Sequence, residues 1–304
     1  MKIIFDCDNT MGIKGCDVNG GLALLYLLGR EDIELCGITT SYGNSNIDTV
    51  YQNTANMLKD IGRTDIQVLK GCPNRYTLES EAADYILETV NANPGNISIL
   101  ATGSLTNLFA AYITDQTIFE RIPQIVVSGG ITEELNINGK VLDELSFSND
   151  PSASQWVLKE GKNLSIITGN NGLSAFIDYS NFVHRCSSST NPLACYIMNK
   201  CEYWFEDMRS CYNVNGFYNW DVFAAAYLAN PKLFKDDYQF ISLNHKDIES
   251  GLLCIVPEKE DASRKVNLPM IKSLQAFNDD IYEAWFAIES NLTNYKMFGQ
   301  LAVL

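Results

Sequence analysis

The sequence predicts an α/β fold in which helices cover both faces of an open, mainly parallel, Rossmann-like β-sheet. Three observations support this. Short β-branched runs alternate with helical patterns, no linker or internal repeat divides the 304 residues, and small polar residues follow the ends of successive strands. Strands that alternate with helices need crossover connections, which make neighbouring strands parallel. We therefore expect a single domain over residues 1–304.

The expected elements follow in chain order. Apolar, β-branched runs predict strands over 2–5, 34–40, 66–69, 97–100, 124–127 and 164–167. Helical patterns between them predict helices over 21–29, 47–61, 79–91, 105–113 and 151–159. The second half is more helical, with helices expected over 191–213, 220–228 and 273–288 and a late hairpin over 239–243 and 252–256.

The composition narrows the class of partners. A net charge of −15 would repel nucleic acid and anionic membranes, and no apolar run is long enough to span a bilayer. The first strand leaves no room for a signal peptide, and nine cysteines without a C-x-x-C pair indicate reduced thiols, so we expect a cytoplasmic protein. The sequence has only two histidines, so a histidine-rich zinc site or a Ser-His-Asp triad is poorly supported. A neutral small molecule or a metal cation is the better partner.

The end of the first strand carries the most informative residues. Asp6 and Asp8 are two apart, so both leave the pleat on the same face, and ligands of open α/β sheets bind beyond the carboxyl ends of strands. Paired carboxylates there hold a hard cation or do acid–base work. The alternative is that Asp6 caps a turn and Asp8 is solvated. Small polar residues over 39–44, 101–104 and 128–130 would line the same cleft.

Together, these segments resemble the inosine–uridine preferring nucleoside hydrolase family. The resemblance is carried by residues 6–8 with 21–24, 37–40 with 43–44, 101–107, 127–130, 144–146 with 150–151, and 220–221 with 225–227, in the family's order. It implies the nucleoside hydrolase fold and hydrolysis of the N-glycosidic bond of ribonucleosides, with bound Ca²⁺. It also implies a nucleoside substrate and a homodimer or homotetramer.

The resemblance assigns roles to four residues around the metal. Asp8 matches the acid that touches the metal and serves as general base, and Asp6 matches its supporting acid. Thr102 would give its backbone carbonyl to Ca²⁺, and Asp221 would supply a carboxylate from the far half of the chain. Asp221 could instead be a helix N-cap or first-turn acid, and both interpretations can hold together.

The resemblance also implies contacts with the nucleoside. Asn44, Asn138 and Glu144 match positions that hold ribose hydroxyls, although each could be an ordinary polar loop residue, and Ser146 stands where the family often has Asn. Trp220 replaces a histidine of many pyrimidine-accepting members, as in the purine-preferring branch, and could stack on a purine. Other aromatic residues nearby could complete that wall or belong to the core: Tyr203, Trp204, Tyr212, Phe217 and Tyr218.

One departure from the family pattern concerns the metal. Members carry two adjacent aspartates before the first helix, one for ribose and one for Ca²⁺, whereas the matching positions here are Asn19 and Gly20. Asn19 could still hydrogen-bond a ribose hydroxyl. Either Asp17, in a longer preceding loop, restores the missing carboxylate, or the site is impaired and the protein is a weak catalyst or a nucleoside binder. We predict an altered site that retains less than one tightly bound Ca²⁺ per chain after dialysis.

A different enzyme class also fits the first strand. Residues 5–10 match the D-x-D-x-T signature of haloacid-dehalogenase-like, Mg²⁺-dependent phosphatases, with Asp6 as nucleophile and Asp8 as acid. That class needs a later Lys and an acidic pair at a strand end. The available pairs, 236–237 and 279–280, lie beside expected helices or turns.

Overall fold

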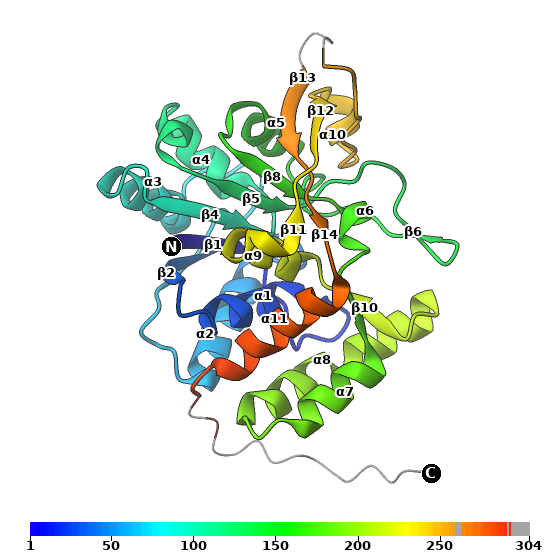
Figure 1. Ribbon diagram of the computed structural model, residues 1–304. Helices are drawn as coiled ribbons and strands as arrows, with labels where there is room; N and C mark the ends of the chain where they lie inside the picture. The colour runs from blue at the N-terminus through cyan, green and yellow to red at the C-terminus, as the bar shows by residue number, and fades with distance from the viewer. Residues whose placement is uncertain (259–262, 291, 293–304) are drawn as a thin grey trace.

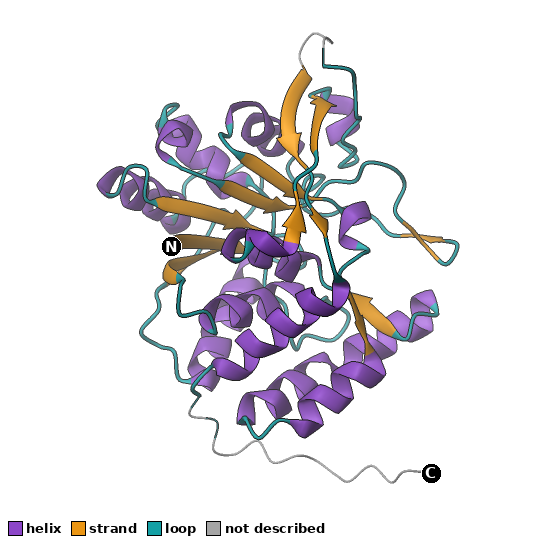
Figure 2. Ribbon diagram, viewed as in Figure 1, coloured by secondary structure: helices purple, strands orange, loops and turns teal. Residues whose placement is uncertain are grey.

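The computed structural model describes residues 1–258, 263–290 and 292, and its centre is an eight-stranded sheet (Figures 1 and 2). The strand order is β12-β13-β8-β5-β4-β1-β2-β3, and all neighbours are parallel except the edge pair β12–β13. The sheet strands are β1 (Lys2–Cys7), β2 (Glu34–Thr40), β3 (Val68–Leu69), β4 (Ile97–Ala101), β5 (Ile125–Ser128), β8 (Leu164–Ile167), β12 (Tyr238–Ser242) and β13 (Ser263–Asn267). Three two-stranded pairs lie outside it: β6 (Asn136–Ile137) with β7 (Lys140–Val141), β9 (Phe176–Asp178) with β10 (Gly216–Tyr218), and β11 (Phe234–Lys235) with β14 (Met270–Ile271).

Helices cover both faces of the sheet. In Figure 1, α3 (Glu81–Ala92), α4 (Thr106–Thr114) and α5 (Pro151–Glu160) lie above it, and α1 (Asn19–Leu28), α2 (Ile47–Ile61), α9 (Trp220–Ala229) and α11 (Leu274–Ala287) lie below. The long helix α8 (Pro192–Tyr212) packs with α7 (Tyr179–Ser188) beyond α11. The remaining short helices are η1 (Ile118–Arg121), α6 (Gly169–Gly172), η2 (Pro231–Leu233) and α10 (His245–Ile248).

Each face of the sheet has its own hydrophobic core, as the alternation of side chains along β1 shows. Ile4 packs with the helices on one side, whereas Ile3 and Phe5 pack with those on the other. Helices α1 and α9 are apolar on nearly all sides, because they lie between the sheet and an outer layer of helices. Both central helices begin at the carboxyl edge of the sheet, which places their first residues beside the strand ends.

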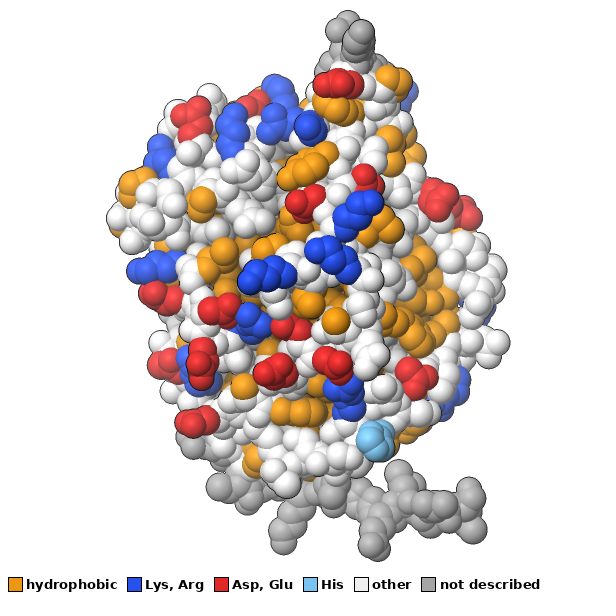
Figure 3. Space-filling model, viewed as in Figure 1, with side chains coloured by type: hydrophobic (Ala, Val, Ile, Leu, Met, Phe, Trp, Pro, Cys, Tyr) orange, Lys and Arg blue, Asp and Glu red, His pale blue; other side chains and the backbone are white. Residues whose placement is uncertain are grey.

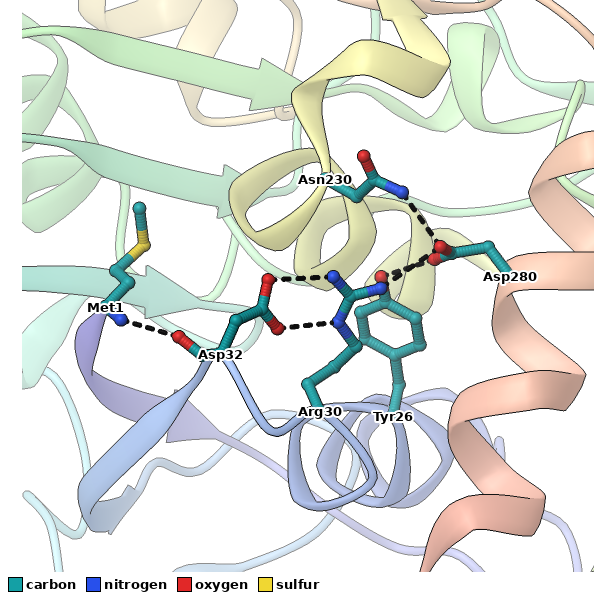
Figure 4. Close-up of polar contacts among 6 residues, drawn as sticks. All are labelled: Met1, Tyr26, Arg30, Asp32, Asn230 and Asp280. Carbon is teal, nitrogen blue, oxygen red and sulfur yellow. Dashed lines mark hydrogen bonds and ion pairs between the residues drawn. The ribbon is translucent and has the colours of Figure 1, made fainter.

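A polar network fixes the other ends of these two helices (Figure 4). The carboxylate of Asp280, on α11, accepts hydrogen bonds from Tyr26 Oη at 2.6 Å, Asn230 Nδ2 at 2.8 Å and Arg30 Nη1 at 3.1 Å. Arg30 also pairs with Asp32 through two hydrogen bonds. Tyr26 belongs to α1 and Asn230 caps α9, so one partly buried acid ties both helices to α11.

The fold class is confirmed: the sheet is mostly parallel, carries helices on both faces and forms one domain. The expected strands over 34–40 and 164–167 and the helix over 47–61 have the predicted bounds. The late hairpin is confirmed only in part: residues 252–256 meet β12 in one antiparallel bridge, between Ile241 and Ile255, whereas the continuous partner of β12 is β13. Helix α7 was not expected. None of the helices in the described residues is long and apolar enough to cross a membrane.

Candidate functional site

A cavity of about 260 Å³ opens at the carboxyl edge of the sheet, where the strand order reverses between β1 and β4. Its walls differ in character. The polar wall comes from the strand ends and the starts of α1 and α9, and it contains Asp8, Asp17, Asn19, Asn44, Thr102, Ser128 and Asp221. The apolar wall contains Ile131, Leu135, Leu142, Trp204, Met208, Tyr212 and Trp220. Such a cavity can take a ligand that is hydroxylated at one end and flat and apolar at the other.

Asp8 follows β1 and is held between two glycines. Its Oδ2 accepts the backbone N–H of Asn44 at 2.8 Å, and its Oδ1 is buried without a partner among the described residues. A Cβ on Gly43 would lie 2.2 Å from Oδ2, and a Cβ on Gly103 would lie 3.0 Å from the Asp8 Cβ. Both positions therefore need glycine for the carboxylate to fit. Burial, followed by the nearby Asp17 charge, raises the pKa of Asp8 to about 8.

Asp6 lies beneath the cavity and does not line it. Its Oδ1 accepts hydrogen bonds from Thr39 Oγ1 at 2.6 Å and Asn107 Nδ2 at 2.8 Å, and the side chain is fully buried. Burial raises the pKa of Asp6 to about 7, although the two hydrogen bonds oppose that shift. Asn107 also bonds the Thr40 carbonyl, so Asp6 ties the ends of β1 and β2 to the start of α4. This is the position of a supporting acid.

Asp17 lies in the cavity, close to Asp8. Its Oδ2 accepts Asn44 Nδ2 at 3.0 Å, and its Oδ1 accepts the Asn19 backbone N–H at 2.9 Å. Asn44 therefore donates to two carboxylates at once, through its side chain to Asp17 and through its backbone to Asp8. Burial raises the pKa of Asp17. The amide oxygen of Asn19 is buried and has no partner in the described part of the chain.

Asp221, in the first turn of α9, brings a carboxylate from the far half of the chain to the same cavity. Burial and then the charges of Asp17 and Asp8 raise the pKa of Asp221 well above its usual value, while the hydroxyls of Ser128 and Thr102 lower it. Helix N-termini favour acids, so the alternative explanation of Asp221 as a first-turn acid holds at the same time. The structure thus brings Asp8 and Asp221 together around one space.

The donor set of the polar wall fits a hard divalent cation. Three carboxylates face the cavity, and Asp8 and Asn19 each offer a buried oxygen without a partner in the described residues. Burial and then the charges of the neighbouring acids raise the pKa of Asp8 and Asp221. No three acidic, thiol or imidazole groups among the described residues lie close enough together to hold a metal ion, so the geometry by itself does not define a metal centre.

The apolar wall contains part of the aromatic set noted in the sequence. Trp220 Nε1 donates to the Gly169 carbonyl at 3.0 Å, so its N–H is engaged and its ring faces are the available surface. Trp204 and Tyr212 also line the cavity, whereas Phe217 belongs to the core. Tyr218 packs beside Trp220 with ring centroids 5.7 Å apart. Figure 3 shows hydrophobic side chains gathered in this region, near α6 and β10.

The segment between β5 and α5 covers one side of the cavity. Not all of its residues that were expected to contact ribose lie in the cavity. Ser146 and Glu144 line the cavity, yet Glu144 accepts the backbone N–H groups of Gly130, Phe147 and Ser148. Asn138 lies outside the cavity and is exposed. It forms the β6–β7 turn with Gly139, both at positive φ, and its side chain donates to the carbonyls of Tyr212 and Asn213. The structure therefore does not bring Asn138 to the expected ribose site.

Some residues that line the cavity were not expected from the sequence. Cys16 and Met208 line the cavity but carry no distinctive motif, and only their neighbours in the fold identify them. The haloacid-dehalogenase-like phosphatase alternative is wrong. In that class the first aspartate is a nucleophile that must face its substrate, whereas Asp6 is fully buried below the cavity. The described lining also contains no lysine.

Comparisons with known proteins agree with this geometry. A family model described as inosine-uridine preferring nucleoside hydrolase matches residues 3–279. The chain is 24% identical to probable uridine nucleosidase 2 of Arabidopsis thaliana, over 89% of this chain and 91% of the relative. It is 27% identical to the inosine-uridine preferring nucleoside hydrolase of Crithidia fasciculata, over 55% of this chain and 59% of the relative.

Solved structures show the same fold. A plant nucleoside hydrolase superposes with a TM-score of 0.82 at 21% identity, covering 94% of this chain and 99% of that one. A purine-preferring ribonucleoside hydrolase from Gardnerella vaginalis superposes with a TM-score of 0.80 at 18% identity, covering 95% of this chain and 99% of that one.

Proposed function

The chain belongs to the inosine-uridine preferring nucleoside hydrolase family, a family of N-glycosidases, and we propose that it hydrolyses ribonucleosides with a preference for purines. The observation that carries the proposal is the division of one cavity into two walls. Ribose hydroxyls match the carboxylates and amides of the polar wall, and a flat nucleobase matches the rings of the apolar wall.

In the proposed reaction, water attacks the anomeric carbon as the bond to the base breaks and positive charge develops on the ribose. Asp8 accepts the proton of that water, the remaining hydroxyl group bonds to the anomeric carbon, and the departing base takes up a proton from solvent, so that one water is added across the broken bond. The Oδ1 of Asp8 has no partner in the described chain, and its Oδ2 is fixed by the Asn44 N–H, so one oxygen is held while the other is available.

Members of this family are typically metal-dependent, and we propose Ca²⁺ as the cation for this chain. Asp8, Asp17, Asp221 and the Thr102 carbonyl would hold it, since Ca²⁺ prefers oxygen ligands. When bound, the cation lowers the pKa of nearby water and neutralises the carboxylates. Asp6 then supports Asp8 from below through the β1 and β2 ends.

The purine preference is proposed from Trp220. Because its N–H is engaged by Gly169, the indole offers a stacking surface and no proton to the leaving base. A purine has more ring area to stack than a pyrimidine. The names of similar proteins give different substrates, uridine for the one from Arabidopsis and purines for the one from Gardnerella, so base preference needs its own measurement.

The test is chromatographic detection of free base from inosine, adenosine, uridine and cytidine in the presence of Ca²⁺. We expect the largest kcat/KM for a purine nucleoside, and we expect Trp220→Ala to reduce the purine-to-pyrimidine ratio. Trp156→Ala, a change on α5 that removes another partly buried indole, is the matched control and should leave the ratio unchanged. Nucleoside binding without base release would instead identify a binding protein, and a pyrimidine preference in the wild type would refute the role of Trp220.

A further inference from the structure

A second cavity, of about 540 Å³, lies at the amino edge of the sheet, where β13 separates from β8. The two strands pair only through Asn267 and Ser165, so the residues before Asn267 diverge from the start of β8 and leave a wedge between the strands. Residues 163–165 form one side of the wedge, and residues 264–267 form the other. The wedge shares no lining residue with the cavity that contains Asp8, which lies at the opposite edge of the sheet.

The charge of the wedge is opposite to that of the whole chain. The sequence has 37 acids and 22 bases, yet the described residues that line the wedge include Arg264 and Lys265 and no Asp or Glu. A neighbouring hollow of about 490 Å³ shares Arg264 with the wedge, adds Lys159 and also has no acid in its described lining. Figure 3 shows Lys and Arg side chains gathered in this region, over α5 and close to β13. Positive charge in a hollow of an acidic protein favours an anionic ligand.

Arg264 has an unused hydrogen-bond donor. Its Nη2 donates to the carbonyl of Gly161, just after α5, which fixes the guanidinium, whereas its Nε is buried without a partner among the described residues. A buried N–H without an acceptor is rare and costs free energy, so we expect a ligand to supply the acceptor. A guanidinium matches the oxygens of phosphate, to which it donates through more than one N–H. Lys265 adds a second charge, and its Nζ lies 5.2 Å from the centre of the Tyr238 ring.

A polar network fixes the narrow end of the wedge, where the strands meet. Asn267 Nδ2 donates to Tyr227 Oη at 2.7 Å, to Asp236 Oδ1 at 2.9 Å and to Ser165 Oγ at 3.3 Å. The same oxygen of Asp236 also accepts the Tyr227 hydroxyl at 2.8 Å, so its charge is engaged by this network. Asn267 is buried, and Tyr227 belongs to α9. The shape of the wedge is therefore set by the packing of β13, β8 and α9 before any ligand binds.

We propose that the wedge binds a phosphate group, with Arg264 as the principal contact and Lys265 as a second positive charge. The site goes beyond ribonucleoside hydrolysis, because it lies away from the cavity that contains Asp8. The bound group supplies the acceptor that Arg264 Nε lacks. It can be free phosphate or part of a small ester, since the donors named here recognise only the phosphate oxygens.

The first experiment is calorimetric titration with inorganic phosphate in a buffer without Ca²⁺. The wild type should bind one phosphate per chain, and Arg264→Gln should weaken binding by about 10-fold or more, because charge-assisted hydrogen bonds are lost. Arg264→Lys keeps the charge without the Nε donor and should fall between these two. Arg209→Gln is the matched control, because Arg209 Nη2 also donates to a carbonyl oxygen, that of the Asn215 side chain, but Arg209 lines neither hollow. No phosphate binding by the wild type, or wild-type affinity in Arg264→Gln, would overturn the proposal.

A second pair of variants tests the location without breaking the bond to Gly161. Lys265 is exposed, so Lys265→Gln should unfold at the wild-type temperature, while its phosphate affinity should fall about threefold. Asp8→Asn removes an acid from the other cavity and should leave phosphate affinity unchanged. Phosphate affinity that responds to Asp8→Asn and not to Lys265→Gln would place the anion in the other cavity and overturn the proposal.

Glycerol 3-phosphate distinguishes the two sources of the phosphate group. Its binding should weaken in Arg264→Gln as that of inorganic phosphate does, and glycerol alone should not bind. Tighter binding than inorganic phosphate would support a phosphate ester as the ligand, and equal binding would support free phosphate. Binding of either probe that does not depend on Arg264 would refute the site. None of these titrations measures base release, so their outcome does not depend on the proposed hydrolysis.

Discussion

Asp280 is expected to be among the most important single polar residues for stability, and Asp32 provides an internal control. Both acids pair with Arg30, but the Asp280 side chain is 12% exposed and the Asp32 side chain 56% exposed. Asp280→Ala removes the acceptor for Tyr26 and Asn230 as well as Arg30, leaving a fully buried hydroxyl and a guanidinium without one partner.

The magnitude follows from the bonds lost. A hydrogen bond to a charged group contributes about 1.5–3 kcal/mol, and the three bonds are not additive because they share one carboxylate. We therefore expect Asp280→Ala to lower the free energy of unfolding by about 2–4 kcal/mol. Asp32→Ala should cost less than about 1 kcal/mol, because water screens an exposed ion pair even when it has two hydrogen bonds.

Urea unfolding followed by circular dichroism measures both free energies by linear extrapolation. The comparison requires equal slopes for the two variants, which indicates that the unfolded state has not changed. If Asp280→Ala cost no more than Asp32→Ala, the network would not fasten α1 and α9 to α11, and the reasoning from burial would be wrong.

Three further predictions test separate features. Gly43→Ala places a Cβ 2.2 Å from Asp8 Oδ2, so kcat/KM should fall by about 100-fold or more while circular dichroism stays unchanged; near-normal turnover would contradict the tight fit around Asp8. Arg30 lowers the pKa of Asp32, so the stability that this pair contributes is present above the usual aspartate pKa and is lost as pH falls through the lowered pKa. Asp32→Asn should therefore be slightly less stable than the wild type at pH 7 and equally stable near pH 2. A difference in stability that does not change with pH would refute this linkage. A thiol reagent should label exposed Cys211 fastest in the native protein, and rapid labelling of the buried thiols would contradict the packing of the core; these are Cys7, Cys72, Cys186 and Cys201.

The parallel half of the sheet was predictable because each strand is a short apolar run between helical patterns. The edge formed by β12 and β13 was not. Residues 252–256 look like a strand, but Leu253 donates its N–H to Ile131 and its side chain fills the core beside β5. The true partner, β13, contains Arg264 and Lys265 and meets β8 only through the pairing of Asn267 with Ser165. Its pairing depends on tertiary contacts and not on local pattern.

The candidate site was predictable where strand ends determine it. Asp8, Thr102 and Asp221 lie together because parallel strands and the helix that packs on them end at one edge. Asn138 could have been recognised as a turn residue, since Asn-Gly between short extended segments is a strong hairpin signal. The sequence predicted the location of Asp17 only as one of two alternatives. That location depends on the hydrogen bond from Tyr203 to the carbonyl of Cys16, the residue before Asp17, and these two residues are 187 positions apart in the sequence.

The rate of base release from inosine by Asp8→Asn, compared with the wild type at the same Ca²⁺ concentration, tests the mechanism most directly. If Asp8 deprotonates the attacking water, the variant should lose about 1,000-fold or more in kcat while it remains folded and still binds the nucleoside. A kcat within about tenfold of the wild type would show that another group takes the proton, and the mechanism built on the two walls of this cavity would be wrong.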